Sequence, residues 1–348
     1  MTNEEILRKL IDKALAVNLL HYSRTSDISL AKGLAGNCLM LYEVSRNNAF
    51  VHLHQRINDE IEKIAGGISI HMPLDLYSGM AGVGIAITQF CNFRLIEQSP
   101  DILLHDIDSH IYRIVWQGIL NQHSMEPSDN SSVDILVYLS FRLLVSMNNI
   151  EEREIYIALC ERLFDKIYYN LSDKFLEEPL PGNLSYKLPK LLLAMSMMHD
   201  AGVYRERICN CCKEIRLKIF TILPFSGFNQ LMFVISMMRL ASSIRDSEWI
   251  SHANLLTQTI NMKDAMRRFL ESYDIYPDGG TAGMYVLAYI HNKMFPDNPI
   301  AISHAQMLND IKRLALYLIS SDIKDILPGL AGISGIVLIF NEMLYGKN

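Results

Sequence analysis

The chain has 348 residues, of which half are apolar and 20% are charged, and its formal net charge is −6. A core of considerable size is therefore possible, and the acidic balance argues against a nucleic-acid binder, which would usually carry a basic face. No stretch is long and apolar enough for a membrane span, no signal peptide opens the sequence, and six irregularly spaced cysteines form no disulfide framework, so we expect a reduced, cytoplasmic protein.

Amphipathic helices that carry charges recur along the whole chain, beginning with residues 3–20. In that segment Ile6, Leu7, Leu10 and Ala14 fall on one helical face. The same periodicity recurs in the segments 49–65, 101–120, 151–171, 203–221, 250–272 and 305–320. Proline is scarce and no alternating strand pattern of any length is present, so the chain is predicted to be all-α.

Between these segments lie seven nearly uncharged apolar stretches, spaced by about 45–55 residues. They begin at Gly33, Ser78, Ser132, Pro181, Phe225, Asp278 and Pro328. A fixed period of this size indicates stacked supersecondary units, and a helix that is apolar all round should be buried. We therefore expect one domain over 1–348, a seven-fold α/α toroid built as a double ring of about fourteen helices. An open solenoid would leave the apolar helices at its two ends uncovered.

Pairs of glycines three residues apart mark four of the predicted inner-helix starts, although glycine in a helix interior costs about 1 kcal/mol against alanine. The pairs are Gly33/Gly36, Gly79/Gly82, Gly280/Gly283 and Gly329/Gly332. A phosphate-binding loop would need a preceding strand and usually a Lys-Ser/Thr ending, and neither is present. The glycines are therefore predicted to let neighbouring helices converge in a crowded ring.

Three of these stretches resemble the repeated G-L-A-G-hydrophobic signature of the lanthionine synthetase C family: KGLAGNCLMLYE, DLYSGMAGVGIAI and PGLAGISGIVLIF. The resemblance implies a seven-fold α/α toroid and a role in peptide modification. Cyclases of that family hold zinc with two cysteines and one histidine. The metal binds a peptide cysteine as thiolate, which adds to a dehydrated Ser or Thr to close a thioether ring.

The zinc ligands implied by the resemblance are absent from the matching positions. Phe225 stands where the first cysteine is expected, and Asp278 and Gly279 stand where cysteine and histidine are expected. We therefore expect no zinc, no metal site and no other cofactor. The cluster CNCC places Cys209 and Cys212 on one helical face, which could begin a metal site or could serve packing alone.

Other departures from the family pattern fall in the third and fourth repeats. The third keeps the family's aspartate as Asp134, and in the fourth Tyr186 replaces a histidine while Lys187 and Lys190 replace glycines. On this resemblance Asp134 and Tyr186 are the candidate catalytic residues. The candidates for peptide or ligand binding are Lys187, Asp278, Tyr276, Phe225 and Ser226. Lys187 could also simply pair with Asp134, and both aspartates could instead cap their own helices.

The resemblance and the missing ligands favour a zinc-free protein of thioether-peptide maturation. It would be either a non-catalytic partner that binds a precursor peptide for another modification enzyme, or a metal-independent cyclase that forms the carbon–sulfur bond. A thiol is a good nucleophile even without a metal. Two alternatives stay open: a pure protein-interaction toroid, and a carbohydrate-active α/α toroid that uses Asp134 and Asp278 as paired carboxylates.

Overall fold

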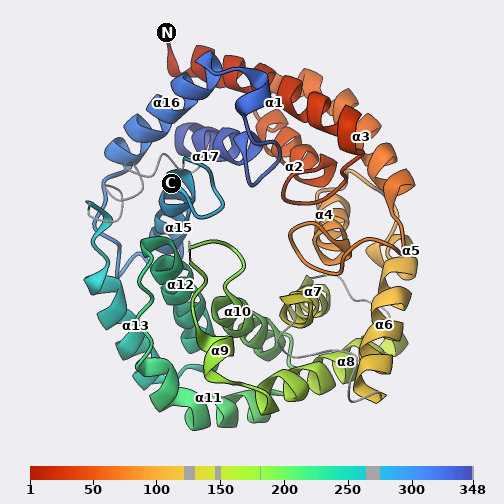
Figure 1. Ribbon diagram of the computed structural model, residues 1–348, viewed down its shortest axis with the longest axis vertical. Helices are drawn as coiled ribbons and strands as arrows, with labels where there is room; N and C mark the ends of the chain where they lie inside the picture. Colours follow the sequence, from red (N-terminus) through yellow and green to blue (C-terminus); the bar gives the residue numbers. More distant parts are fainter. Residues whose placement is uncertain (121–129, 146–149, 181, 264–274, 347–348) are drawn as a thin grey trace.

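The computed structural model describes residues 1–120, 130–145, 150–180, 182–263 and 275–346. These residues contain helices and no strand, and the helices form two concentric rings (Figure 1). The all-α, α/α-toroid prediction is therefore confirmed. Pro181, at which one of the repeats was expected to begin, lies outside the described residues.

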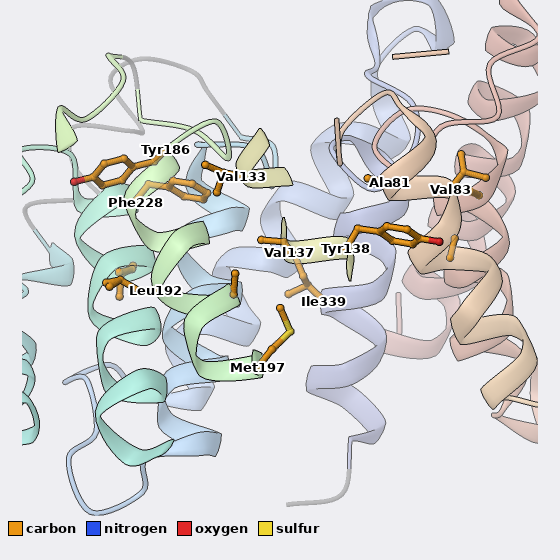
Figure 2. Packing of buried hydrophobic residues seen from close by; sticks show 14 of the residues in the cluster. Ala81, Val83, Val133, Val137, Tyr138, Tyr186, Leu192, Met197, Phe228 and Ile339 are labelled. Carbon is orange, nitrogen blue, oxygen red and sulfur yellow. The ribbon is translucent and has the colours of Figure 1, made fainter. Parts of the chain in front are cut away.

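The inner ring consists of the nearly uncharged helices. Within the described residues its members are α2 (Leu34–Ser45), α4 (Met80–Asn92), α7 (Asn130–Val145), α10 (Lys187–Asp200), α12 (Gly227–Ile244), α15 (Thr281–Met294) and α17 (Ile333–Tyr345). Their apolar side chains join one core, to which Val137 of α7, Met197 of α10 and Ile339 of α17 belong (Figure 2). Burial on nearly every face explains why these sequences carry so few charges.

The outer ring consists of the amphipathic helices. Its described members are α1 (Asn3–Thr25), α3 (His54–Gly67), α6 (His105–Leu120), α8 (Ile150–Tyr169), α11 (Arg205–Phe220), α13 (Ser247–Thr259) and α16 (His304–Ser320). Short helices complete the connections: η1 (Asn48–Leu53), α5 (Pro100–Leu103), α9 (Asp173–Leu176) and η2 (Ile323–Asp325).

Three of the segments predicted as single outer helices are divided: 49–65 consists of η1 and α3, 101–120 consists of α5 and α6, and 250–272 is interrupted after α13. The segment 250–272 was expected to be a single helix, but α13 already ends at Thr259. Ile260 takes an extended backbone, and the side chain of Asn261 accepts the backbone N–H of Lys263 at 3.1 Å. Asparagine competes in this way with helical hydrogen bonds and therefore favours a break. Residues 264–272 lie outside the described part of the chain.

The ring is closed by contacts between its first and last repeats. Helix α1 packs against both α16 and α17, and α17 packs against α2 (Figure 1). A buried polar cluster spans the junction: Asn18 of α1 donates to Asn37 of α2 and to Ser334 of α17, and accepts the backbone N–H of Gly329 at 2.9 Å. These polar groups are buried, so the loss of one of them would leave its partner without a hydrogen bond, which would cost free energy.

The glycines make room mainly for the loops that precede their own helices. A Cβ added at Gly82 would lie 2.1 Å from the carbonyl oxygen of Leu76, and one added at Gly36 would lie 2.0 Å from that of Leu30. Neighbouring repeats contribute as well, since Leu330 would contact a Cβ at Gly36 and Leu30 one at Gly82. The predicted convergence of neighbouring helices is therefore wrong for these two glycines, because loop residues of the same repeat, and then of a neighbouring one, fill the space.

Gly84 has a separate reason for lacking a side chain. A Cβ there would lie 2.5 Å from the ring of Tyr138, which is fully buried and reaches from α7 toward α4 (Figure 2). The small residue thus admits an aromatic ring between two inner helices.

Candidate functional site

A pocket of about 640 Å³ opens at the end of the toroid where the inner helices begin. Its walls are the loops that lead into α4, α10 and α15, together with the first turns of α7 and α10. It is lined by Pro73, Leu74, Asp75, Tyr77, Ser131, Asp134, Asn183, Leu184, Ser185, Lys190 and Asp278. We call this cavity the mouth pocket.

Asp134 lies in the wall of the mouth pocket, on the second turn of α7. Its carboxylate is 3% exposed; one oxygen accepts the backbone N–H of Leu76 at 3.1 Å, and the other lies 2.6 Å from the ammonium group of Lys190. Burial raises the pKa of Asp134 above its usual value, and Lys190 opposes that rise. The lysine that pairs with Asp134 is therefore Lys190 and not Lys187.

Asp278 enters the same pocket from the loop before α15. One of its oxygens accepts the backbone N–H of Leu184 at 3.0 Å, which ties this loop to the loop before α10. Burial, followed by the negative charge of Asp278, raises the pKa of Tyr77, whose ring lines the pocket from the loop before α4. Three loops thus meet around this carboxylate.

Neither aspartate caps its own helix, so the capping interpretation is wrong. Helix α7 begins at Asn130, four residues before Asp134, and the N-cap of α15 is Gly280. Both carboxylates instead accept backbone N–H groups of loops in other repeats. They join separate repeats at the mouth, which local capping would not do.

Tyr186 does not line the mouth pocket. Its side chain is 1% exposed and lies beside Phe228 among buried apolar residues (Figure 2), with its hydroxyl 3.4 Å from the carbonyl oxygen of Leu176. Burial, and then the charge of Glu178, raises the pKa of Tyr186 above its usual value. In this position the hydroxyl contacts neither Asp134 nor the pocket, so the two candidate catalytic residues are not brought together.

The other predicted binding residues also lie outside the pocket lining. Lys187 places its ammonium group 5.8 Å from the ring centre of Phe175, and the hydroxyl of Tyr276 accepts the backbone N–H of Leu327 at 3.2 Å. Phe225 is 73% exposed. The structure therefore brings together only Asp134 and Asp278 from the seven predicted site residues.

Ser226 is half-buried, and its backbone N–H, like that of Phe225, donates to the carboxylate of Glu178. Glu178 thus anchors the turn that precedes α12. This turn is built around a carboxylate and backbone amides, which is a structural arrangement and not a cluster of metal ligands.

The positions that the family resemblance assigns to zinc do not suit the metal. Phe225 has no donor atom in its side chain, Gly279 has no side chain, and the carboxylate of Asp278 already holds the loop at Leu184. Zinc needs three or four nitrogen, sulfur or carboxylate ligands. In the described part of the chain no three His, Cys, Asp or Glu side chains are grouped so that they could hold a metal ion.

The cysteine cluster of α11 shows no feature of a reactive site. Cys209 is half-buried, while Cys211 and Cys212 are buried, and burial raises the pKa of Cys211 to about 11 and that of Cys212 further. A raised thiol pKa disfavours the thiolate that binds metals and attacks electrophiles. All six cysteines of the chain are free, as their irregular spacing predicted.

Sequence reasoning missed most of the pocket lining. Asp75 accepts the backbone N–H groups of Tyr77 and Ser78 and so shapes the loop before α4. Lys190 was noticed only as a replacement for glycine. A signal for it was available, because a second lysine one turn after Lys187 on an otherwise apolar helix needs a buried partner.

The closed double ring with a pocket at its mouth defines an α/α toroid. No protein-family model matches the sequence, and no curated protein matches it. Among solved structures the chain is similar to nisin cyclase, with a TM-score of 0.69 and 16% identity over 99% of this chain and 95% of that chain. The two proteins share the fold along nearly their whole lengths. No helix in the described residues has the length and apolar character required to cross a bilayer.

Proposed function

We propose that this protein is a lanthionine synthetase C-like protein of peptide modification, which binds a precursor peptide in the mouth pocket. The observation that carries the proposal is the agreement of the whole ring with nisin cyclase, whose name states that it cyclises nisin, a peptide. The glycine signature at the inner-helix starts supports the same family. A cytoplasmic location is part of this proposal, since precursor peptides are synthesised there.

The dimensions of the mouth pocket suit a short peptide segment. Its volume of about 640 Å³ lies within the range of about 300–1,000 Å³ that is usual for ligand sites. Apolar side chains (Pro73, Leu74, Leu184) and charged ones line the pocket together, so that both side chains and backbone groups of a peptide would find complementary surface.

Within this proposal the protein acts without zinc and serves as a peptide-binding partner of another modification enzyme. The support is the replacement of the three implied ligands by Phe225, Asp278 and Gly279, and the engagement of Asp278 in a loop contact. Elemental analysis of the purified protein is expected to find no stoichiometric zinc; one zinc per chain would contradict this part of the proposal.

Peptide binding can be tested by obstructing the pocket. Leu184 is 39% exposed and lines the cavity, whereas Leu180 is 74% exposed and does not. Leu184→Trp should weaken the binding of a fluorescent precursor peptide by about tenfold or more, equivalent to about 1.4 kcal/mol, and Leu180→Trp should leave it unchanged. Equal affinities of the two variants, or no binding to the wild type, would favour a protein-interaction toroid instead.

A metal-independent cyclase is the second candidate, because the Asp134 carboxylate lies in the pocket wall with a raised pKa, as a proton acceptor or donor would require. A dehydrated, cysteine-bearing peptide is incubated with the protein, and ring closure is followed by thiol blocking and mass spectrometry. Closure that is lost in Asp134→Asn supports catalysis there. Tyr186→Phe tests the catalytic prediction for Tyr186, whose buried hydroxyl would act only after a rearrangement.

The carbohydrate alternative gains one observation, since Asp134 and Asp278 line the same pocket. Against it, Trp116 and Trp249 belong to outer-ring helices rather than to the pocket lining. Both oxygens of Asp134 are engaged, which counts equally against catalysis by this carboxylate in the sugar enzyme and in the cyclase. A precursor-peptide or dehydratase gene beside this one would favour peptide modification. Neighbouring genes for polysaccharide enzymes would favour a carbohydrate-active enzyme.

A further inference from the structure

A second cavity, of about 200 Å³, lies in the outer ring where α5 and α6 meet α8. Figure 1 shows these helices on the side of the ring opposite α13 and α16. The cavity is smaller than the usual ligand site and has the size of a single side chain. We call it the outer pocket.

The outer pocket is lined by three carboxylates: Asp101, Asp108 and Glu152. Beneath them the guanidinium of Arg142 is completely buried and donates to Asp101 at 2.9 Å and to Asp108 at 3.2 Å. Among the described residues no lysine or arginine lines the cavity. One buried cation thus serves two carboxylates, and Glu152 adds a further negative charge at the opening.

A buried hydroxyl also lies in the wall of the outer pocket. Tyr156 is 6% exposed, and its Oη lies near Asp108 and Arg142 but makes no hydrogen bond of good geometry in the described part of the chain. It lies close enough to Asp108 for that carboxylate to contribute, after burial, to a raised pKa of Tyr156. A buried hydroxyl whose hydrogen bonds are incomplete loses part of their free energy, which a ligand with a suitable polar group would recover.

The rim of the outer pocket is apolar and exposed. Tyr112 is 40% exposed and Ile155 is 47% exposed, and both line the cavity. Aliphatic and aromatic surface around a negative cavity matches a lysine or arginine side chain, whose stem is apolar and whose head is cationic. The same cavity is poorly matched to an anion or to a wholly apolar group.

We propose that the outer pocket receives a lysine or arginine side chain of a partner protein. The cationic head approaches Glu152 and the carboxylate oxygen of Asp101 that does not accept from Arg142. The stem lies against Tyr112 and Ile155. This contact is on the outside of the ring and is independent of peptide binding in the mouth pocket.

The test uses a short capped peptide with a central lysine and the same peptide with norleucine, which keeps the stem and removes the charge. Trp116 reports on the site, because Tyr112 stacks on it with ring centres 5.9 Å apart, whereas Trp249 is fully buried. The lysine peptide should change the fluorescence saturably, and the norleucine peptide should bind about tenfold more weakly.

Matched variants separate the pocket from general surface charge. Glu152→Gln should weaken the lysine peptide about fivefold, and Tyr156→Phe about threefold, while Glu151→Gln, next to the pocket but not lining it, should have no effect. Three results would overturn the proposal: equal binding of lysine and norleucine peptides, equal effects of Glu151→Gln and Glu152→Gln, or free n-butylammonium binding as tightly as the lysine peptide, which would assign the pocket to a small amine.

Discussion

Replacing Lys190 by methionine tests how the mouth pocket is held together. The change keeps most of the side-chain volume but leaves the Asp134 carboxylate, which is 3% exposed, without its cation. Removing one partner of a buried pair costs about 3–5 kcal/mol. An unfolding entropy of about 2.1 cal/mol/K per residue gives about 0.7 kcal/mol/K for 348 residues, so Tm should fall by about 4–7 °C.

The loss of stability in Lys190→Met should also depend on pH, and the titration of Asp134 sets the direction of that dependence. Its folded pKa is already raised above the usual 3.8 by burial, and removal of Lys190 raises it further. The folded state then binds the proton more tightly than the unfolded state, so stability falls as pH rises through the folded pKa. Lys190→Met should therefore be closer to the wild type at about pH 5 than at about pH 8.

Urea unfolding at both pH values measures these differences. The matched control is Lys293→Met, which removes an exposed Lys293–Glu342 pair of 3.0 Å and should cost no more than about 1 kcal/mol. Adding Asp134→Asn to Lys190→Met should restore most of the stability, because no buried charge remains. The reasoning is refuted if Lys190→Met costs no more than Lys293→Met, or if its cost is the same at both pH values.

Three further substitutions test the buried cation beneath the outer pocket, the packing between α4 and α7, and the closure of the ring. Arg142→Met should cost about 3–5 kcal/mol in urea unfolding and more at high pH, because it leaves Asp108, whose pKa burial raises, without its buried cation; a cost below about 1 kcal/mol would contradict the assignment. Gly84→Ala should destabilise by about 1–3 kcal/mol, since the new Cβ would meet the Tyr138 ring at 2.5 Å, and a gain in Tm would show that the ring moves freely. Asn18→Ala should cost about 2 kcal/mol and speed hydrogen exchange in α1 and α17; unchanged exchange would argue against its closing role.

The fold was predictable because its signals are local. Each inner helix is nearly free of charge and each outer helix is amphipathic. Every repeat therefore shows in its own sequence which helix is buried and which faces solvent. The end of α13 at Thr259 was not predictable from periodicity, because the amphipathic pattern continues past it. The asparagine that follows was the available sign of a break.

The site was less predictable because its contacts join distant repeats. The pairing of Asp134 with Lys190 spans 56 residues and depends on how far each inner helix is rotated about its axis. Tyr186, the N-cap residue of α10, has its side chain in the core, although the family pattern placed it among the catalytic candidates. Burial of a large aromatic side chain stabilises the folded state, and a comparison of motifs does not take this stabilisation into account.

The closure of the ring fixes the number of its repeats. In an open solenoid a helix pair can be added or deleted at little cost, because each repeat contacts only its neighbours. Here α1 packs against α16 and α17, so an eighth pair would change the angle between every two adjacent repeats and separate Asn18 from Ser334. Changes that keep this ring closed are therefore confined to loops and side chains, which is where this chain has its pockets.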